Sequence, residues 1–138
     1  PFDPLVAPDM IAMIEPGVCD YAPLASLPPG HVLAPLDAGP EILGKTGHTI
    51  VMASYHRNQL PMRDVILAFT APLGEARGAV ARQAPDYLVG CTAAADFGLY
   101  RNADPANLAN AMATGDVPAW LEPVEGFGAG PLKVYRVR

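Results

Sequence analysis

The chain has 138 residues, of which 51% are apolar and 17% charged. This length and balance are typical of one folded domain with a real core, and they exclude a disordered tail. The formal net charge is -5 and no basic stripe is present, so we expect no nucleic-acid partner. No apolar run approaches the roughly 18 residues that span a bilayer, and no signal-peptide pattern opens the chain.

The first part of the chain, residues 1–30, is rich in proline and has no sustained hydrophobic period. Met10–Glu15 and Tyr21–Leu27 each favour a short helical turn, and the prolines and glycine at 28–30 close the segment. We expect this lead-in to pack on the surface of a domain formed by residues 31–138, so that the chain is a single domain overall.

From residue 31 onward, short apolar runs alternate with helical patterns. The runs that favour strands are His31–Leu36, Thr49–Ser54, Tyr87–Cys91, Trp120–Val124 and Leu132–Val137. The patterns that favour helices cover 40–45, 62–69, 73–83 and 105–113, with a break near Ala71 and Pro72. Asp104 is placed to cap the last of these helices and Gly115 to end it.

This order predicts an α/β domain with a mainly parallel sheet that helices cover on both faces, a three-layer Rossmann-like arrangement. The closing pair of strands predicts a C-terminal antiparallel hairpin. Its connection, Glu125–Pro131, contains a G-x-G-x-G string. A phosphate cradle needs a helix directly after such a string, so these glycines are assigned to a hairpin loop.

Three residues follow the expected strands at the edge where parallel sheets usually bind ligands: Asp37, His56 and Cys91. Together they offer the side chains of a Cys–His–Asp nucleophilic site, which could hydrolyse an ester or thioester. No nucleophile-elbow motif accompanies them. The structural alternative, in which Cys91 is buried or bonded and Asp37 caps a helix, is favoured because buried cysteines are usually structural.

The most polar cluster is Tyr55-His56-Arg57-Asn58, followed by Arg63. Arg57 and Arg63 could hold a phosphate or carboxylate through forked hydrogen bonds, and His56 could donate or accept a proton. The alternative is an ordinary loop whose polar groups satisfy exposed backbone. Both interpretations stay open, because loops at the rim of a rigid sheet often carry function.

The two cysteines, Cys19 and Cys91, could be free thiols or one disulfide, and their number does not decide the compartment. A bond between them would close a long loop and stabilise the fold by about 4 kcal/mol in the chain-entropy account. His31 and His48 stand at strand starts, and no Cys/His spacing matches a zinc motif. We therefore expect no metal and no cofactor.

The order of several segments resembles the C-terminal soluble domain of bacterial polytopic membrane proteins. These are related to membrane glycosyltransferases that use lipid-phosphate-linked sugar donors. The resemblance covers roughly residues 19 to 137 and is carried by His31–Leu43, His48–Val51, Tyr55–Asn58, Asp86–Cys91, Pro118–Pro123 and Leu132–Arg136. It agrees with a chain that begins at Pro1, without an initiator Met, as expected for a segment of a longer protein.

The resemblance implies an extracytoplasmic domain at the periplasmic face of the bacterial inner membrane, where a Cys19–Cys91 disulfide is expected. Its partners would be the transmembrane region of its own parent chain and a glycan or lipid-linked sugar. None of the family's catalytic residues corresponds to a position here, so the domain would be non-catalytic and would assist substrate binding or assembly. Asp37, Arg63 and the Tyr55–Asn58 cluster would form its contact surface.

Two other functions fit the same residues. One is a small cysteine-dependent hydrolase that uses Cys91, His56 and Asp37. The other is a module that binds an anionic small molecule through Arg57 and Arg63. The hydrolase requires a free thiol at Cys91, whereas the accessory role predicts that Cys91 is bonded to Cys19.

Overall fold

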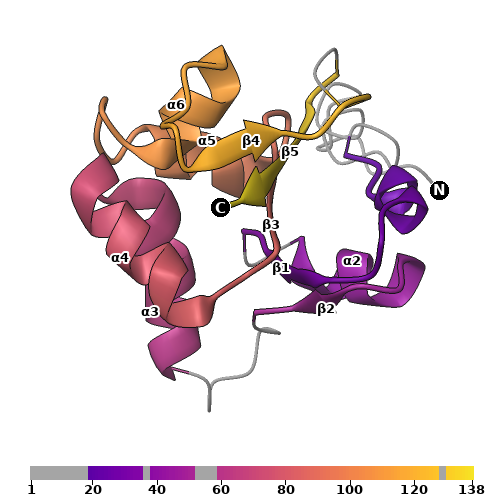
Figure 1. Ribbon diagram of the computed structural model, residues 1–138. Coiled ribbons are helices and arrows are strands. Elements are labelled where there is room, and N and C mark those ends of the chain that lie inside the picture. Colours follow the sequence, from indigo (N-terminus) through magenta and orange to yellow (C-terminus); the bar gives the residue numbers. More distant parts are fainter. Residues whose placement is uncertain (1–18, 36–37, 52–58, 128–129) are drawn as a thin grey trace, which may run out of the picture.

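A computed structural model gives the fold and describes residues 19–35, 38–51, 59–127 and 130–138. The elements, in chain order, are the 3₁₀ helix η1 (Ala22–Ser26), β1 (His31–Leu33), α2 (Gly39–Lys45), β2 (Thr49–Ile50), α3 (Gln59–Thr70), α4 (Leu73–Gln83), β3 (Tyr87–Cys91), α5 (Ala95–Arg101), α6 (Leu108–Thr114), β4 (Leu121–Pro123) and β5 (Leu132–Val137). Figure 1 shows helices α3 to α6 on one side of the sheet, with α2 and η1 on the other.

The strands form one five-stranded mixed sheet in the order β2-β1-β3-β5-β4. Strand β1 pairs in parallel with both β2 and β3. Strand β5 runs antiparallel to both of its neighbours, β3 and β4. The α/β class and the antiparallel hairpin at the C-terminal end of the chain are therefore confirmed, and the parallel pairs belong to the first half of the sheet.

The central strand β3 is buried along its whole length, from Tyr87 to Cys91. Because successive side chains of a strand point to opposite faces, Leu88 packs into the core beneath α3 to α6. Tyr87, Val89 and Cys91 pack into a second core, beneath α2 and η1. Burial on both faces explains why this strand has a continuous apolar sequence and not an alternating one.

Gly90 is the glycine in β3 that lets the helices approach the sheet. A Cβ at this position would lie 2.6 Å from Cε2 of Phe97 and 3.1 Å from Cε of Met112. Phe97 belongs to α5 and Met112 to α6, and both are 0% exposed. The bare backbone at Gly90 therefore sets how closely these two helices sit on β3.

The last two helices differ from the sequence-based expectation. Helix α5 was missed, and α6 begins at Leu108 with Asn107 as its N-cap. Asn107 accepts a hydrogen bond from the backbone N–H of Asn110 at 3.0 Å. The assignment of this cap to Asp104 was wrong, because that carboxylate accepts from the N–H of Ala106, in a turn before the helix. Gly115 ends α6 as predicted, with φ of 83°.

Several elements are shorter than expected at their ends. Strand β1 stops at Leu33, and the hairpin strand β4 covers only Leu121–Pro123. The turn expected within Tyr21–Leu27 is confirmed as η1. The turn expected at Met10–Glu15 lies outside the described residues, as does the end of the expected strand Thr49–Ser54.

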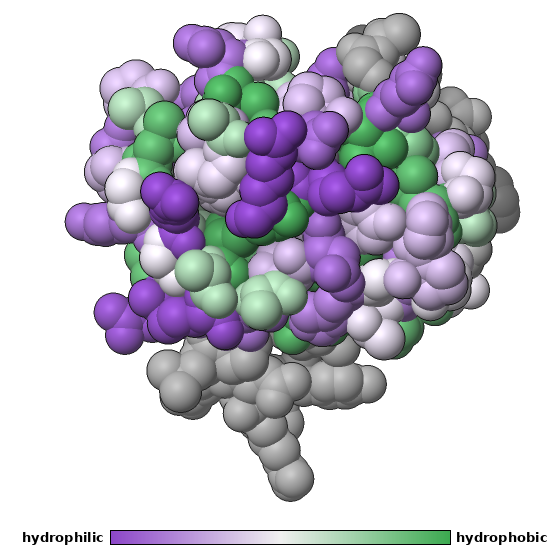
Figure 2. Space-filling view, viewed as in Figure 1, coloured by the Kyte–Doolittle hydropathy of each residue, from purple (hydrophilic) through white to green (hydrophobic). Residues whose placement is uncertain are grey.

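Within the parts of the chain that the structure describes, no helix combines the length and apolar character needed to cross a bilayer. On the face shown in Figure 2, hydrophobic residues are visible between hydrophilic ones and not as one broad area.

We predict that Gly90→Ala lowers the free energy of unfolding by about 1–3 kcal/mol, because the added methyl group overpacks the contact with Phe97 and Met112. Gly98→Ala is the matched control. It lies in α5, where an added Cβ meets no atom within 4 Å, and it should stabilise the helix by about 0.5–1 kcal/mol. Urea unfolding of both variants measures this. Equal effects of the two substitutions would contradict the close approach at Gly90.

Candidate functional site

Several strands end or begin at one edge of the sheet, the edge formed by the carboxyl ends of its parallel strands. The parallel strands β1 and β3 end there, at Leu33 and Cys91. The antiparallel strand β5 begins at the same edge, because Leu132 lies opposite Cys91 in the ladder. The connection from β4 to β5 therefore also lies there. This is the edge at which open α/β sheets usually bind ligands.

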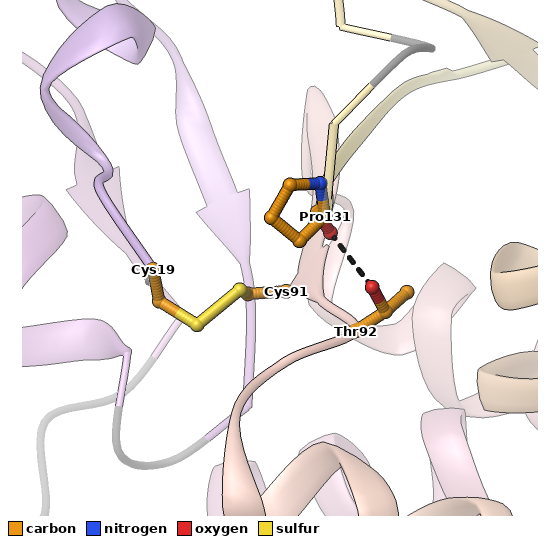
Figure 3. Close-up of a disulfide and its surroundings, with 4 residues drawn as sticks. All are labelled: Cys19, Cys91, Thr92 and Pro131. Atoms are coloured by element: carbon orange, nitrogen blue, oxygen red, sulfur yellow. Dashed lines mark hydrogen bonds between the residues drawn. A yellow bond between two sulfur atoms is a disulfide. The ribbon is translucent and has the colours of Figure 1, made fainter. Parts of the chain in front are cut away.

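A disulfide joins Cys19 to Cys91 at this edge (Figure 3). The two residues are 72 positions apart in the sequence, and their Cα atoms lie 6.0 Å apart. Cys91 is fully buried, and Cys19 packs against the second core. The pairing implied by the family resemblance is confirmed, and the bond fixes the segment just before η1 to the end of β3.

The same bond excludes the proposed Cys–His–Asp nucleophile. Only a thiolate attacks as a nucleophile, and the sulfur of Cys91 is bonded to Cys19. The hydrolase hypothesis was therefore wrong for the protein in this state. Its other two members, His56 and Asp37, lie outside the described residues.

A second contact that holds helix η1 comes from the side chain of His48. This imidazole is 2% exposed. Its Nδ1 accepts the backbone N–H of Gly30 at 3.0 Å, so its Nε2 carries the hydrogen and donates to the carbonyl of Leu24 at 2.6 Å. Sequence reasoning missed this role, because both partners are main-chain groups 18 and 24 residues away.

The β4–β5 connection is held by Thr92, the residue that follows β3. Its backbone N–H donates to the carbonyl of Pro131 at 2.9 Å. Its hydroxyl donates to the same oxygen at 3.4 Å (Figure 3). The end of β3 therefore anchors η1 through a disulfide and the β4–β5 connection through hydrogen bonds.

A groove of about 410 Å³ lies between these two anchored segments. We call it the hairpin groove. Asp20, Pro23 and Ser26 line it from the side of η1, and Glu125, Phe127 and Pro131 from the side of the β4–β5 connection. Both carboxylates are exposed, and no Lys or Arg is among its described lining residues. The groove is therefore acidic, with apolar surface from an aromatic ring and prolines.

Arg63 is the described member of the predicted anion-binding cluster, and Tyr55, His56, Arg57 and Asn58 lie outside the described residues. Arg63 is exposed on α3, next to the buried Asp64. The carboxylate of Asp64 accepts from Nη2 of Arg82 at 2.7 Å and from Nε of Arg82 at 3.0 Å. It also accepts from the side-chain amide of Gln83 at 2.6 Å.

These contacts tie α3 to α4 and decide the charge state of Asp64. The hydrogen bonds from Arg82 lower the pKa of Asp64, and they outweigh the opposing effect of burial. The hydrogen bond from Gln83 and the nearby charge of Arg63 lower the pKa further. The charge of Arg82 is thus compensated by Asp64, and Arg63 contributes the excess positive charge of this surface.

Comparison with known proteins identifies a fold and no family. No protein-family profile and no curated protein sequence matches the chain. Among solved structures, the chain is similar to the C-terminal globular domain of an oligosaccharyltransferase from Archaeoglobus fulgidus. The TM-score is 0.64 and the sequence identity is 15%, over 86% of this chain and 92% of that one. At this identity the similarity establishes a shared fold.

Removing the disulfide should cost the fold about 4 kcal/mol, because the unfolded chain regains the freedom of a long loop. We predict this loss in the free energy of unfolding for the double variant Cys19→Ala/Cys91→Ala, measured by urea unfolding without reductant. Reductant should lower the stability of the wild type and leave the double variant unchanged. Two free thiols in protein produced in an oxidising compartment and analysed without reductant would contradict the bond.

Asp64→Asn should lower the free energy of unfolding by about 1–3 kcal/mol near neutral pH, because Arg82 and Gln83 lose a charged acceptor. Since folding lowers the pKa of Asp64, its carboxylate contributes fully above the unfolded value of 3.8. That contribution is lost as the pH falls through the lower folded value. The difference between wild type and variant should therefore shrink as the pH falls below 3.8. The control is Asp116→Asn, an exposed carboxylate for which we expect little change.

Proposed function

We propose that this chain is a non-catalytic, extracytoplasmic globular domain of a membrane glycosyltransferase-like protein, where it assists substrate binding or assembly. The observation that carries the proposal is the structural similarity to a domain of an oligosaccharyltransferase. That similarity covers most of both chains, so it relates one whole domain to another. A shared motif inside otherwise different folds would not do so.

The disulfide supports the extracytoplasmic part of the proposal. Such bonds persist in oxidising compartments such as the bacterial periplasm and are rare in the cytosol. Cys19–Cys91 joins the segment before η1 to the central strand β3, so the bond links two parts of the fold that are far apart in the sequence. We propose the periplasmic face of the inner membrane as its location.

The accessory role is favoured over the cysteine hydrolase by the state of Cys91. The sulfur that hydrolysis would need is buried and bonded. We further propose that the two helix layers about the sheet form a Rossmann-like three-layer arrangement. Support comes from the order β2-β1-β3 of the parallel strands, with α2 and α3–α4 as their connections.

We also propose a contact surface made of Asp37, the Tyr55–Asn58 cluster and Arg63, directed at the parent's transmembrane region or at a lipid-linked sugar. Arg63 supports this, because its side chain is exposed and is an additional positive charge beside the compensated pair of Asp64 and Arg82. A guanidinium in this setting is suited to a phosphate.

The test uses the full-length parent protein in its own membrane. Protease added to spheroplasts should cut this domain, whereas protease added to inside-out vesicles should leave it intact. Deleting the domain should lower glycosyl transfer or the amount of assembled enzyme, and the isolated oxidised domain should transfer no sugar. Cleavage from the cytoplasmic side, or turnover of a lipid-phosphate sugar by the isolated domain, would overturn the proposal.

A further inference from the structure

We propose that the hairpin groove binds an uncharged saccharide. The ring of Phe127 would lie against the C–H face of a sugar, and the carboxylates of Asp20 and Glu125 would accept hydrogen bonds from its hydroxyl groups. The inference rests on the proposed function and names the class of substrate that the domain would hold.

The composition of the groove supports a ligand with an apolar face and a hydroxyl-bearing edge. Its volume of about 410 Å³ is within the range of small-molecule sites. Phe127, Pro23 and Pro131 supply flat apolar surface, and two carboxylates supply the polar contacts. A sugar ring has these two kinds of surface together.

The polar groups of the groove are arranged as acceptors. The hydroxyl hydrogen of Ser26 is donated to the carbonyl of Pro23 at 2.8 Å, which leaves its lone pairs for a ligand. Asp20 accepts the N–H of Ala22 at 3.0 Å through Oδ1, so its other oxygen is available. Sugar hydroxyls are the donors that such groups need, and their hydrogen bonds to carboxylates are charge-assisted and strong.

The charge of the groove argues against a phosphate at the same place. Asp20 and Glu125 are the charged residues in its described lining, and both are acidic. Two carboxylates would repel a phosphate or a sugar phosphate. The positive charge of Arg63 lies elsewhere, on the α3–α4 surface.

A covalent bond and hydrogen bonds hold part of each wall of the groove. The disulfide holds the segment of Asp20, and the bonds from Thr92 hold Pro131. Phe127 is half-buried against the second core, so part of its ring is anchored. A preformed site loses less conformational entropy on binding, which favours even a weakly interacting ligand.

The experiment is an NMR titration of the oxidised, isotope-labelled chain with three uncharged probes: mannotriose, maltotriose and N-acetylchitotriose. At least one should bind with a Kd of roughly millimolar order. Its addition should shift the amides of Asp20, Gly126, Phe127 and Gly130. Glu125→Gln should weaken binding by about 3- to 10-fold, because a neutral amide is the weaker acceptor.

Two further variants separate recognition from folding. Phe127→Leu keeps an apolar side chain against the core but removes the aromatic ring, and it should weaken binding at least as much as Glu125→Gln. Glu75→Gln makes the same chemical change as the groove variant at an exposed position on α4, and it should leave binding unchanged. Equal effects of the two Glu→Gln substitutions would overturn the assignment.

Two probes of other chemistry complete the test. Inorganic phosphate should not shift the groove amides, and tetralysine should act only weakly and in a salt-dependent manner. Groove shifts with tetralysine alone would identify a site for cationic peptides and overturn the saccharide proposal. So would the absence of groove shifts with all three saccharides. That failure would leave the protease and transfer results on the parent unchanged, whereas cytoplasmic exposure with intact saccharide binding would overturn only the proposed function.

Discussion

The bond between Cys19 and Cys91 is the constraint on which the arrangement at the carboxyl ends of β1 and β3 depends. Cys91 is the last residue of β3, the strand that pairs with both β1 and β5. A segment bonded there is held to the central strand of the sheet. The packing of η1 over the second core and the wall that it gives to the hairpin groove both follow from that attachment. His48 secures the same helix through a main-chain carbonyl at its other side.

The elements with strong local patterns were predictable from the sequence. Tyr87–Cys91 and Leu73–Gln83 have the bounds expected from their apolar run and helical period. Helix α5 was not predictable in this way. Phe97 is its only buried side chain among the described residues, and one apolar position does not make a helical period. The cap of α6 was misplaced because Asp104 before Pro105 also satisfies local rules. A tertiary contact favours Asn107 as the cap, because its side-chain amide also donates to the carbonyl of Tyr100 near the end of α5.

The site was less predictable than the fold, for a physical reason. The two cysteines could be named from the sequence, yet whether they are free or bonded to each other was implied only by the family resemblance. The groove has no local signature, since Asp20 and the pair Glu125 and Phe127 come from two distant segments that only the folded sheet brings together. The hydrogen bonds that hold its walls involve the main chain at Leu24 and Pro131. A main-chain group offers the same hydrogen bond whatever its side chain, so these contacts cannot be read from residue types.

Two regions of the described surface differ in charge. The hairpin groove is acidic, while Arg63 adds a positive charge beside the internally compensated pair on α3 and α4. A lipid-linked sugar is itself divided in this way, with an uncharged glycan and an anionic phosphate. Under the saccharide proposal, the groove can hold the glycan only if the phosphate stays outside it. The domain would therefore sort the two parts of such a molecule by charge, and specificity at the groove would come as much from repulsion of phosphate as from contacts with sugar.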